Sequence, residues 1–344
     1  MLRHLVAFVL LFLVWTGLRP APAPAQPIAM PPTVLGAELA QRPIPAAAPA
    51  APAIVSDNGV PLPADGPELL SPLPNASTTP WPGTALAPWT WQAVPDGLMY
   101  KSYLAGLKEP RLGTQWVHEK NDGWLWDSTL GARVGLLRYG TQDALWPEGW
   151  QIDVEGAAFP RLDSERNLVS VDFRAGVPVT MRIGHWESKF AYYHMSSHLG
   201  DEFMLSYDDF ARTHFVSPRL NYARETLVLG LAFRPTPDWR LYGEAGWAFY
   251  EDGGSRPWEF QFGVEYSPAQ PTGFRWVPFL AVNGAVRQEA DYGGNLTVQT
   301  GLQLRSHSGR LARVGVQYFN GKSEQRQFFR DFEEQIGAGL WYDF

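Results

Sequence analysis

The 344-residue sequence contains no cysteine. A disulfide framework and a thiolate metal site are therefore both excluded. Basic residues are in the minority, with 28 Lys and Arg against 35 Asp and Glu, and the net charge is −7. An acidic balance argues against nucleic acid as a partner, because binding to phosphates needs a basic face. The sequence also lacks glycine-rich phosphate loops and zinc-protease motifs.

Long hydrophobic runs are missing except at the N-terminus. There a short basic start precedes the apolar run 5–15, and Ala23-Pro24-Ala25 supplies the small-x-small pattern that signal peptidase cleaves after. The run is shorter than the roughly 20 residues that a membrane-spanning helix needs. We therefore expect residues 1–25 to be a signal peptide that directs export.

Residues 26–95 are dominated by Pro and Ala, as in "APAPAQPIAMPP". Such a segment has too few regularly spaced apolar positions to bury a core, and too much proline for a helix or a sheet. It is predicted to be an extended, largely disordered linker.

From Trp124 onward, apolar and polar residues alternate with a period of two, which is typical of strands with two different faces. Soluble strands average roughly 5–6 residues, whereas a tilted membrane strand needs roughly 9–11. Segments such as 239–250 and 276–287 have the greater length. Their ends carry aromatic residues, as expected for girdles at two membrane interfaces: Trp239, Tyr250, Trp258, Tyr266 and Trp276. The pattern predicts an all-β, transmembrane, antiparallel up-and-down β-barrel.

The C-terminal sequence "IGAGLWYDF" has one apolar face that ends on a terminal aromatic residue, Phe344. It resembles the closing strand of bacterial outer-membrane proteins. The resemblance implies a Gram-negative-type envelope, outer-membrane lipid around the barrel, and recognition of Phe344 by the barrel-assembly machinery. It also implies that both termini are periplasmic.

Counting strands backwards from Phe344 gives alternating short and long connections and eleven strands. Residues 184–187 read as a short periplasmic turn and residues 199–218 as a long outer loop. Because an even number is expected, a further strand is predicted within residues 96–123. The barrel domain, residues 96–344, should therefore have about 12 strands, with 10–14 possible.

Polar residues are concentrated in "HMSSHLGDEF", at the outer end of one predicted strand. Lys189 should face the lumen, so that Phe190, Tyr192, His194 and Ser196 face lipid. On the next strand, Asn221, Ala223 and Glu225 should lie on the same side. An imidazole beside a hydroxyl can take its proton, and a neighbouring Asn or Glu can fix the tautomer of the imidazole.

This His-x-Ser arrangement is similar to that of outer-membrane phospholipase A, a family of twelve-stranded barrels. The resemblance implies a lipid hydrolase whose site faces the outer leaflet, with Ser196 as nucleophile, His194 as base and Asn221 as orienting residue. Glu225 is the alternative orienting residue. In that family Asn-Gly follows the serine, whereas Ser197-His198 follows it here.

Other interpretations of the same residues stay open. Ser196, Ser197, Asp201 and Glu202 can be polar groups of a loop in a barrel without catalysis. His198, Asp201 and Glu202, with His194, can instead hold a metal ion, although their spacing matches no strong ligand signature. The sequence does not reveal the acyl substrate, the oligomeric state or whether calcium takes part.

Charged residues on the opposite face of the strands are expected to line the lumen. At about twelve strands they should form a salt-bridged plug, and a narrow selective pore is the alternative. These residues are Arg224, Arg234, Arg240, Arg287, Arg305 and Arg313, with Glu244, Glu259 and Glu265. From Asp96 to the end, stretches such as "GWQIDVEGAAFPRLD" and "VDFRAGVPVTMRIG" resemble a bacterial family of unknown function, which supports the barrel.

Overall fold

The computed structural model describes residues 87–204 and 220–344. The expected signal peptide, the linker up to residue 86 and most of the predicted loop 199–218 lie outside the described residues. The strands of the described part are β1 (Thr90–Ala93), β2 (Leu112–Glu119), β3 (Gly123–Gly140), β4 (Gly149–Leu162), β5 (Leu168–Ile183), β6 (Trp186–Leu199), β7 (Ala223–Thr236), β8 (Trp239–Asp252), β9 (Trp258–Tyr266), β10 (Val277–Arg287), β11 (Gly293–Arg305), β12 (Leu311–Lys322) and β13 (Phe332–Asp343). Two short 3₁₀ helices are η1 (Gln288–Ala290) and η2 (Arg326–Phe328).

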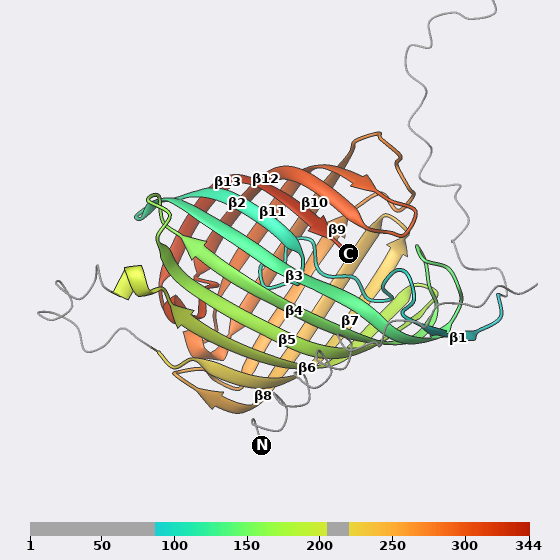
Figure 1. Cartoon of the computed structure of the whole chain (residues 1–344), viewed down its shortest axis with the longest axis horizontal. Helices are drawn as coiled ribbons and strands as arrows, with labels where there is room; N and C mark the ends of the chain where they lie inside the picture. The colour runs from blue at the N-terminus through green and yellow to red at the C-terminus, as the bar shows by residue number, and fades with distance from the viewer. Residues whose placement is uncertain (1–86, 205–219) are drawn as a thin grey trace, which may run out of the picture. The chain divides into compact units, whose positions relative to one another are not determined.

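Strands β2 to β13 form a closed antiparallel barrel (Figure 1). Each strand pairs with its neighbours in sequence, and β13 pairs with β2, which closes the ring. We call the end that carries Phe344 the C-terminal rim and the other end the opposite rim. The strand predicted within residues 96–123 is β2, so the described residues confirm the prediction of a twelve-stranded transmembrane barrel.

One boundary needs correction. The sequence assigns residues 90–93 to the disordered linker, yet β1 pairs in antiparallel fashion with β3. This pairing is possible because β3 is 18 residues long and continues beyond β2 at the C-terminal rim. Two tryptophans of this segment contact Tyr139 there, with ring centroids 5.6 Å away for Trp89 and 4.9 Å for Trp91.

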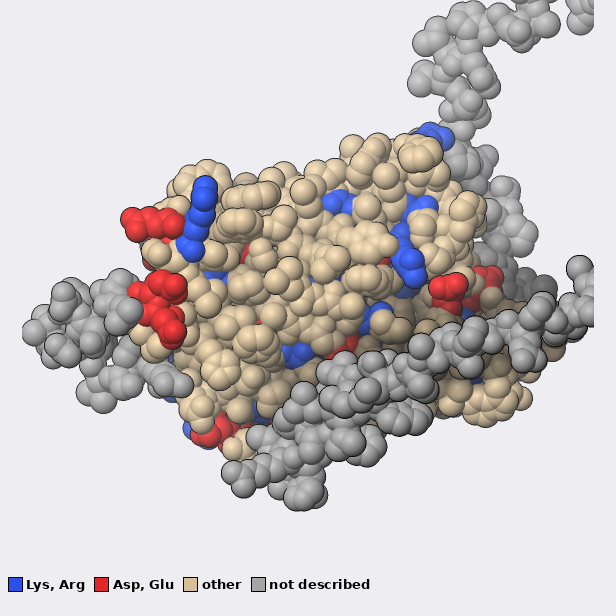
Figure 2. Space-filling model, viewed as in Figure 1, with Lys and Arg blue, Asp and Glu red and all other residues tan. Residues whose placement is uncertain are grey.

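The outward face of the barrel is apolar. Large hydrophobic side chains are exposed on it, including Phe190, Leu229, Leu231, Phe262 and Ile336. On the side shown in Figure 2, the middle of the barrel is mostly uncharged and acidic side chains gather toward the two ends. Because such a surface is stable only in contact with lipid, the chain spans a membrane through this belt. Within the described ranges, no helix has the length and apolar character needed to cross a bilayer.

The lumen is filled by charged side chains and by the chain itself. The arginines predicted to line it are all buried, and Glu265 is buried with them. Glu187 forms one centre of this network, with its Oε1 2.5 Å from Arg234 Nε and its Oε2 3.0 Å from Arg240 Nε. Buried charges persist only when they are paired in this way, so the salt-bridged interior predicted from the sequence is confirmed.

Residues 96–111 do not add a strand to the wall. They run inside the barrel, as the cyan trace in Figure 1 indicates, and bury Tyr100, Tyr103, Leu104 and Ala105 among lumen side chains. The Tyr103 ring stacks on that of Tyr242 at 3.8 Å. We call residues 96–111 the inner segment.

Arginine side chains hold the inner segment by donating to its backbone carbonyls. Arg111 Nη1 donates to Leu104 O at 2.7 Å, and Arg138 Nη2 donates to Asp96 O and Gly97 O at 2.9 Å. A buried loop needs such partners because its backbone carbonyls cannot reach water. The lumen arginines therefore serve as hydrogen-bond donors to this segment as well as ion-pair partners.

The connection between β12 and β13 folds over the opposite rim. Gln327 of η2 donates to Ser197 O at 2.8 Å and to Leu220 O at 2.9 Å, which ties η2 to β6 and to the residues before β7. Phe329 packs against Met195 and Tyr222 below it. The inner segment therefore occupies part of the lumen, and η2 packs over its opposite rim.

Candidate functional site

The outward face of β6 carries a histidine that is bonded to a carboxylate on the next strand. His194 and Glu225 are directly opposite in the register of β6 and β7, and His194 Nδ1 lies 2.9 Å from Glu225 Oε1. Because a carboxylate accepts, Nδ1 is the donor in this bond, and in a neutral imidazole the other nitrogen, Nε2, is an acceptor. The imidazole is 33% exposed. Its orientation therefore leaves a proton acceptor at the lipid-facing surface.

Tyr192 is the second hydrogen-bond partner of Glu225. Its hydroxyl donates to Glu225 Oε2 at 2.5 Å, so each carboxylate oxygen has one partner. A carboxylate on an apolar outer face is unfavourable unless its oxygens are satisfied. Only 15% of the Glu225 side chain is exposed. The two contacts explain how a carboxylate is held at this position.

Ser196 lies on the same outward face as His194, as the alternation of β6 predicts. Two residues of a strand span roughly 6.6 Å, which is within reach of a serine and a histidine side chain. Ser196 pairs with Ala223 on β7, whose side chain is small. Within residues 87–204 and 220–344, the Ser196 hydroxyl makes no hydrogen bond, so the contact to His194 is not formed in this structure.

Ser197, by contrast, faces the lumen. It is buried, and its hydroxyl donates to Asp172 on β5. His198 returns to the outward face and packs edge-on against Phe173, with ring centroids 6.0 Å apart. Ser196 therefore has a histidine two residues away on each side. Of these two histidines, only His194 is bonded to a carboxylate of the described residues.

Asn221 does not take the place predicted for it. It precedes β7, and its amide nitrogen donates to Asp252 Oδ2 at 3.3 Å, away from the imidazole. The reason is the register, which places Glu225 opposite His194. The part played by Tyr192 was not predicted, although its spacing from His194 could have indicated it.

The described residues contain no group of three or more His, Asp or Glu side chains that could hold a metal ion. His198, Asp201 and Glu202 therefore do not form such a group in this structure.

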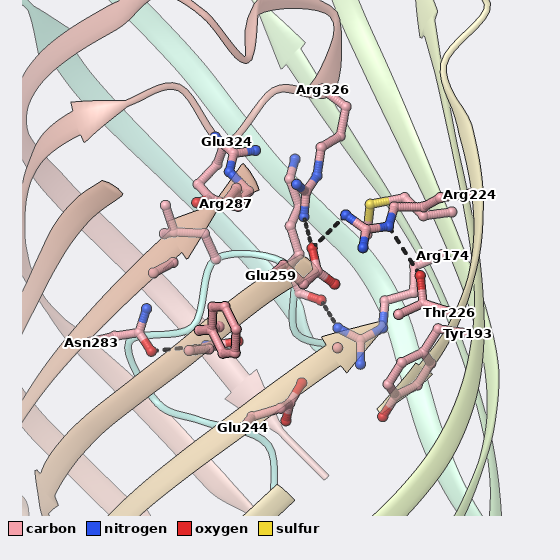
Figure 3. A pocket seen from close by; sticks show the side chains of 17 residues that line it. Arg174, Tyr193, Arg224, Thr226, Glu244, Glu259, Asn283, Arg287, Glu324 and Arg326 are labelled. Carbon is pink, nitrogen blue, oxygen red and sulfur yellow. Dashed lines mark hydrogen bonds and ion pairs between the residues drawn. The ribbon is translucent and has the colours of Figure 1, made fainter. Parts of the chain in front are cut away.

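A second candidate site lies inside the barrel, near the opposite rim (Figure 3). It is a pocket of about 690 Å³, counting space open to solvent, between the inner segment and the loop that contains η2. Glu259 on β9 accepts from Arg224 at 2.9 Å and from Arg326 at 3.3 Å. The pKa of Glu324 is lowered; burial alone would raise it, but the guanidinium groups of Arg287 and Arg326 outweigh burial.

A family model described as "Protein of unknown function (DUF1207)" matches residues 54–344. The chain belongs to this family. No curated protein matches the chain in sequence. The family assignment agrees with the resemblance found in the sequence and assigns no chemistry.

Solved structures similar to this chain are bacterial barrels. The outer membrane phospholipase of Salmonella typhi, a dimer with bound calcium, has 11% identity and a TM-score of 0.47, with 71% of this chain and 94% of that chain covered. The Escherichia coli outer membrane phospholipase A has 10% identity and a TM-score of 0.45, with coverage of 68% and 90%. The KdgM porin has 9% identity and a TM-score of 0.38, with coverage of 68% and 99%. These likenesses concern barrel architecture only.

Proposed function

We propose that this barrel resides in the outer membrane and hydrolyses acyl esters of membrane lipids, with Ser196, His194 and Glu225 as its reactive residues. The observation that carries the proposal is the hydrogen bond between His194 Nδ1 and Glu225 Oε1 at 2.9 Å on the lipid-facing surface. A histidine oriented by a carboxylate, with its other nitrogen free, is the arrangement that activates a serine hydroxyl.

In the first step, Ser196 Oγ attacks the ester carbonyl carbon while its proton passes to His194 Nε2. The tetrahedral intermediate then breaks the bond to the alcohol oxygen, and the protonated imidazole gives its proton to that leaving group. Water hydrolyses the acyl-serine through the same base and releases a fatty acid. Glu225 stays ionised and stabilises the imidazolium.

The position of the site suits a substrate that arrives from the bilayer. Ser196 lies near the end of β6 at the opposite rim, and its strand neighbours on the outward face include the exposed Phe173 and the small Ala223. An acyl chain in the membrane can lie along this surface with its ester near the rim. Formation of the contact between serine and imidazole is expected on substrate binding, since catalytic hydrogen bonds are often long in free enzymes.

The test is fatty-acid release from phospholipid and from lipopolysaccharide by the full chain refolded in detergent–lipid micelles. Ser196→Ala should abolish release, and His194→Asn should lower it by about 10³-fold or more, because each removes a member of one reacting unit. Far-UV circular dichroism should show an unchanged barrel.

His198→Asn is the matched control. It removes a histidine from the same face of the same strand, also two residues from Ser196, and should leave most activity intact. Absence of any lipid turnover by the folded wild type would overturn the proposal and leave the barrel with a structural role. Equal losses in His194→Asn and His198→Asn would contradict the role given to Glu225.

A further inference from the structure

The pocket inside the barrel is lined by buried hydrogen-bond donors that have no partner. Tyr193, Arg174 and Arg326 all line it, and they are only 5%, 8% and 5% exposed. Among the described residues, the Tyr193 hydroxyl, Arg174 Nε and Arg326 Nε have no hydrogen-bond partner. Buried polar groups are almost always satisfied, so three unpaired groups around one cavity indicate a missing acceptor.

The remaining contacts of these side chains hold them in position. Arg174 Nη1 donates to Lys108 O at 2.8 Å, and its Nη2 lies 2.9 Å from Glu155 Oε1. The Arg174 guanidinium lies 3.8 Å from the centre of the Tyr193 ring, and the two side chains stand next to each other in Figure 3. The free donors therefore belong to side chains that are fixed before any ligand arrives, which lowers the entropic cost of binding.

Among the described lining residues, no buried side-chain carboxylate or amide oxygen is left unpaired. Five cations and three carboxylates line the pocket: Lys108, Arg174, Arg224, Arg287 and Arg326, against Glu244, Glu259 and Glu324. Further carboxylates pair with these cations from the wall, including Glu155, Asp172 and Glu289. The network thus has five cations and six carboxylates and is nearly balanced in charge. Its unpaired lining groups can all donate, while in the wall Glu155 Oε1, 2.9 Å from Arg174 Nη2, also lacks a hydrogen-bond partner.

We infer that this pocket binds a small oxyanion, either free phosphate or the phosphate or carboxylate group of a larger solute. Its oxygens would accept from Tyr193, Arg174 Nε and Arg326 Nε, and the surrounding cations would stabilise its charge. The inner segment lines the pocket through Leu107 and Lys108. The inner segment therefore forms part of the wall of the pocket.

The experiment is isothermal titration calorimetry of the full chain, refolded in detergent at low ionic strength. Sodium phosphate and sodium acetate are titrated separately, with sodium chloride and a neutral sugar as blanks. We expect saturable binding of phosphate and weaker binding of acetate, since phosphate offers more acceptor oxygens to three donors. Saturation by acetate alone would assign the site to carboxylates.

Two conservative variants test the donors. Tyr193→Phe keeps the ring next to Arg174 and removes only the hydroxyl; it should weaken binding about tenfold, the usual effect of one hydrogen bond to a charged group. Arg174→Lys keeps the charge but removes Nε and should weaken binding at least as much. Tyr100→Phe is the control, because Tyr100 is a lumen tyrosine outside the pocket whose hydroxyl is paired with Tyr103 at 2.6 Å.

The inference fails if neither anion gives saturable heat, in which case water alone satisfies the three donors. It also fails if binding is unchanged in Tyr193→Phe and Arg174→Lys. Lipid hydrolysis does not enter this experiment, so its outcome is separate from that of the proposed function.

Discussion

The two faces of β6 place neighbouring residues in opposite environments. Tyr193 faces inward, where cations and carboxylates surround it, and His194 faces outward, toward lipid. Inside, ion pairs are numerous, and the unpaired groups that line the pocket, the Tyr193 hydroxyl among them, can donate hydrogen bonds. Outside, Glu225 is fully paired, and the unused group is an acceptor nitrogen on His194.

Because of this difference, substitutions on the inner face and on the outer face should affect different properties of the protein. Removing an inner charge leaves its partner buried and unpaired, which is costly in any folded state. Removing an outer polar group from a half-exposed surface costs little stability but deprives His194 or Ser196 of a partner. Inner variants should therefore change the free energy of unfolding, and outer variants should change activity.

The largest effect is expected at Glu187. Glu187→Ala leaves Arg234 and Arg240 without their shared carboxylate and should lower the free energy of unfolding by about 3–5 kcal/mol. Urea unfolding of the barrel in lipid vesicles measures this. The exposed pair of Lys120 and Glu334 provides the control, since Glu334→Ala should change stability by less than about 1 kcal/mol. Similar values for both variants would contradict the comparison.

A smaller effect, confined to activity, is expected at Glu225. Glu225→Gln keeps the shape of the side chain but removes the charge that stabilises the imidazolium, and should lower kcat by about 100-fold or more. Its unfolding curve should stay close to that of the wild type. A large loss of stability with no change in the specific activity of the folded fraction would make Glu225 structural.

The smallest effect is expected at Tyr192. Tyr192→Phe removes the hydroxyl that bonds Glu225 Oε2 and leaves the bond to His194 in place. Activity should fall by about threefold to tenfold, less than the usual effect of one hydrogen bond to a charged group, because Tyr192 acts only through Glu225. Initial rates of fatty-acid release at saturating lipid measure it. A fall as large as that of Glu225→Gln would place Tyr192 in the reaction itself.

Much of the barrel follows from the sequence because a strand alternates its faces residue by residue. That rule placed Lys189 in the lumen and His194 and Ser196 outside, and the structure agrees. The partner of His194 could not be fixed in the same way. It depends on the register of β6 and β7, and the connection of more than twenty residues between them leaves that register free.

The sequence did not predict that the inner segment lies in the lumen, for a related reason. Residues 96–111 have no period of two, and their burial depends on lumen arginines that lie far away in the sequence, such as Arg313, whose Nη2 donates to Leu104 O at 3.3 Å. The pocket of unused donors was missed as well, because a pattern of alternating residues shows which face a side chain takes but not which atoms remain unpaired.

The most direct test of the account is whether Ser196 is an activated nucleophile. The folded barrel is incubated with a lipid-like fluorophosphonate, which reacts only with activated serines, and the modified residue is located by mass spectrometry. We predict phosphonylation at Ser196 in the wild type and in His198→Asn, and its loss in His194→Asn. No modification of Ser196 in the wild type, or equal modification in both histidine variants, would contradict the account.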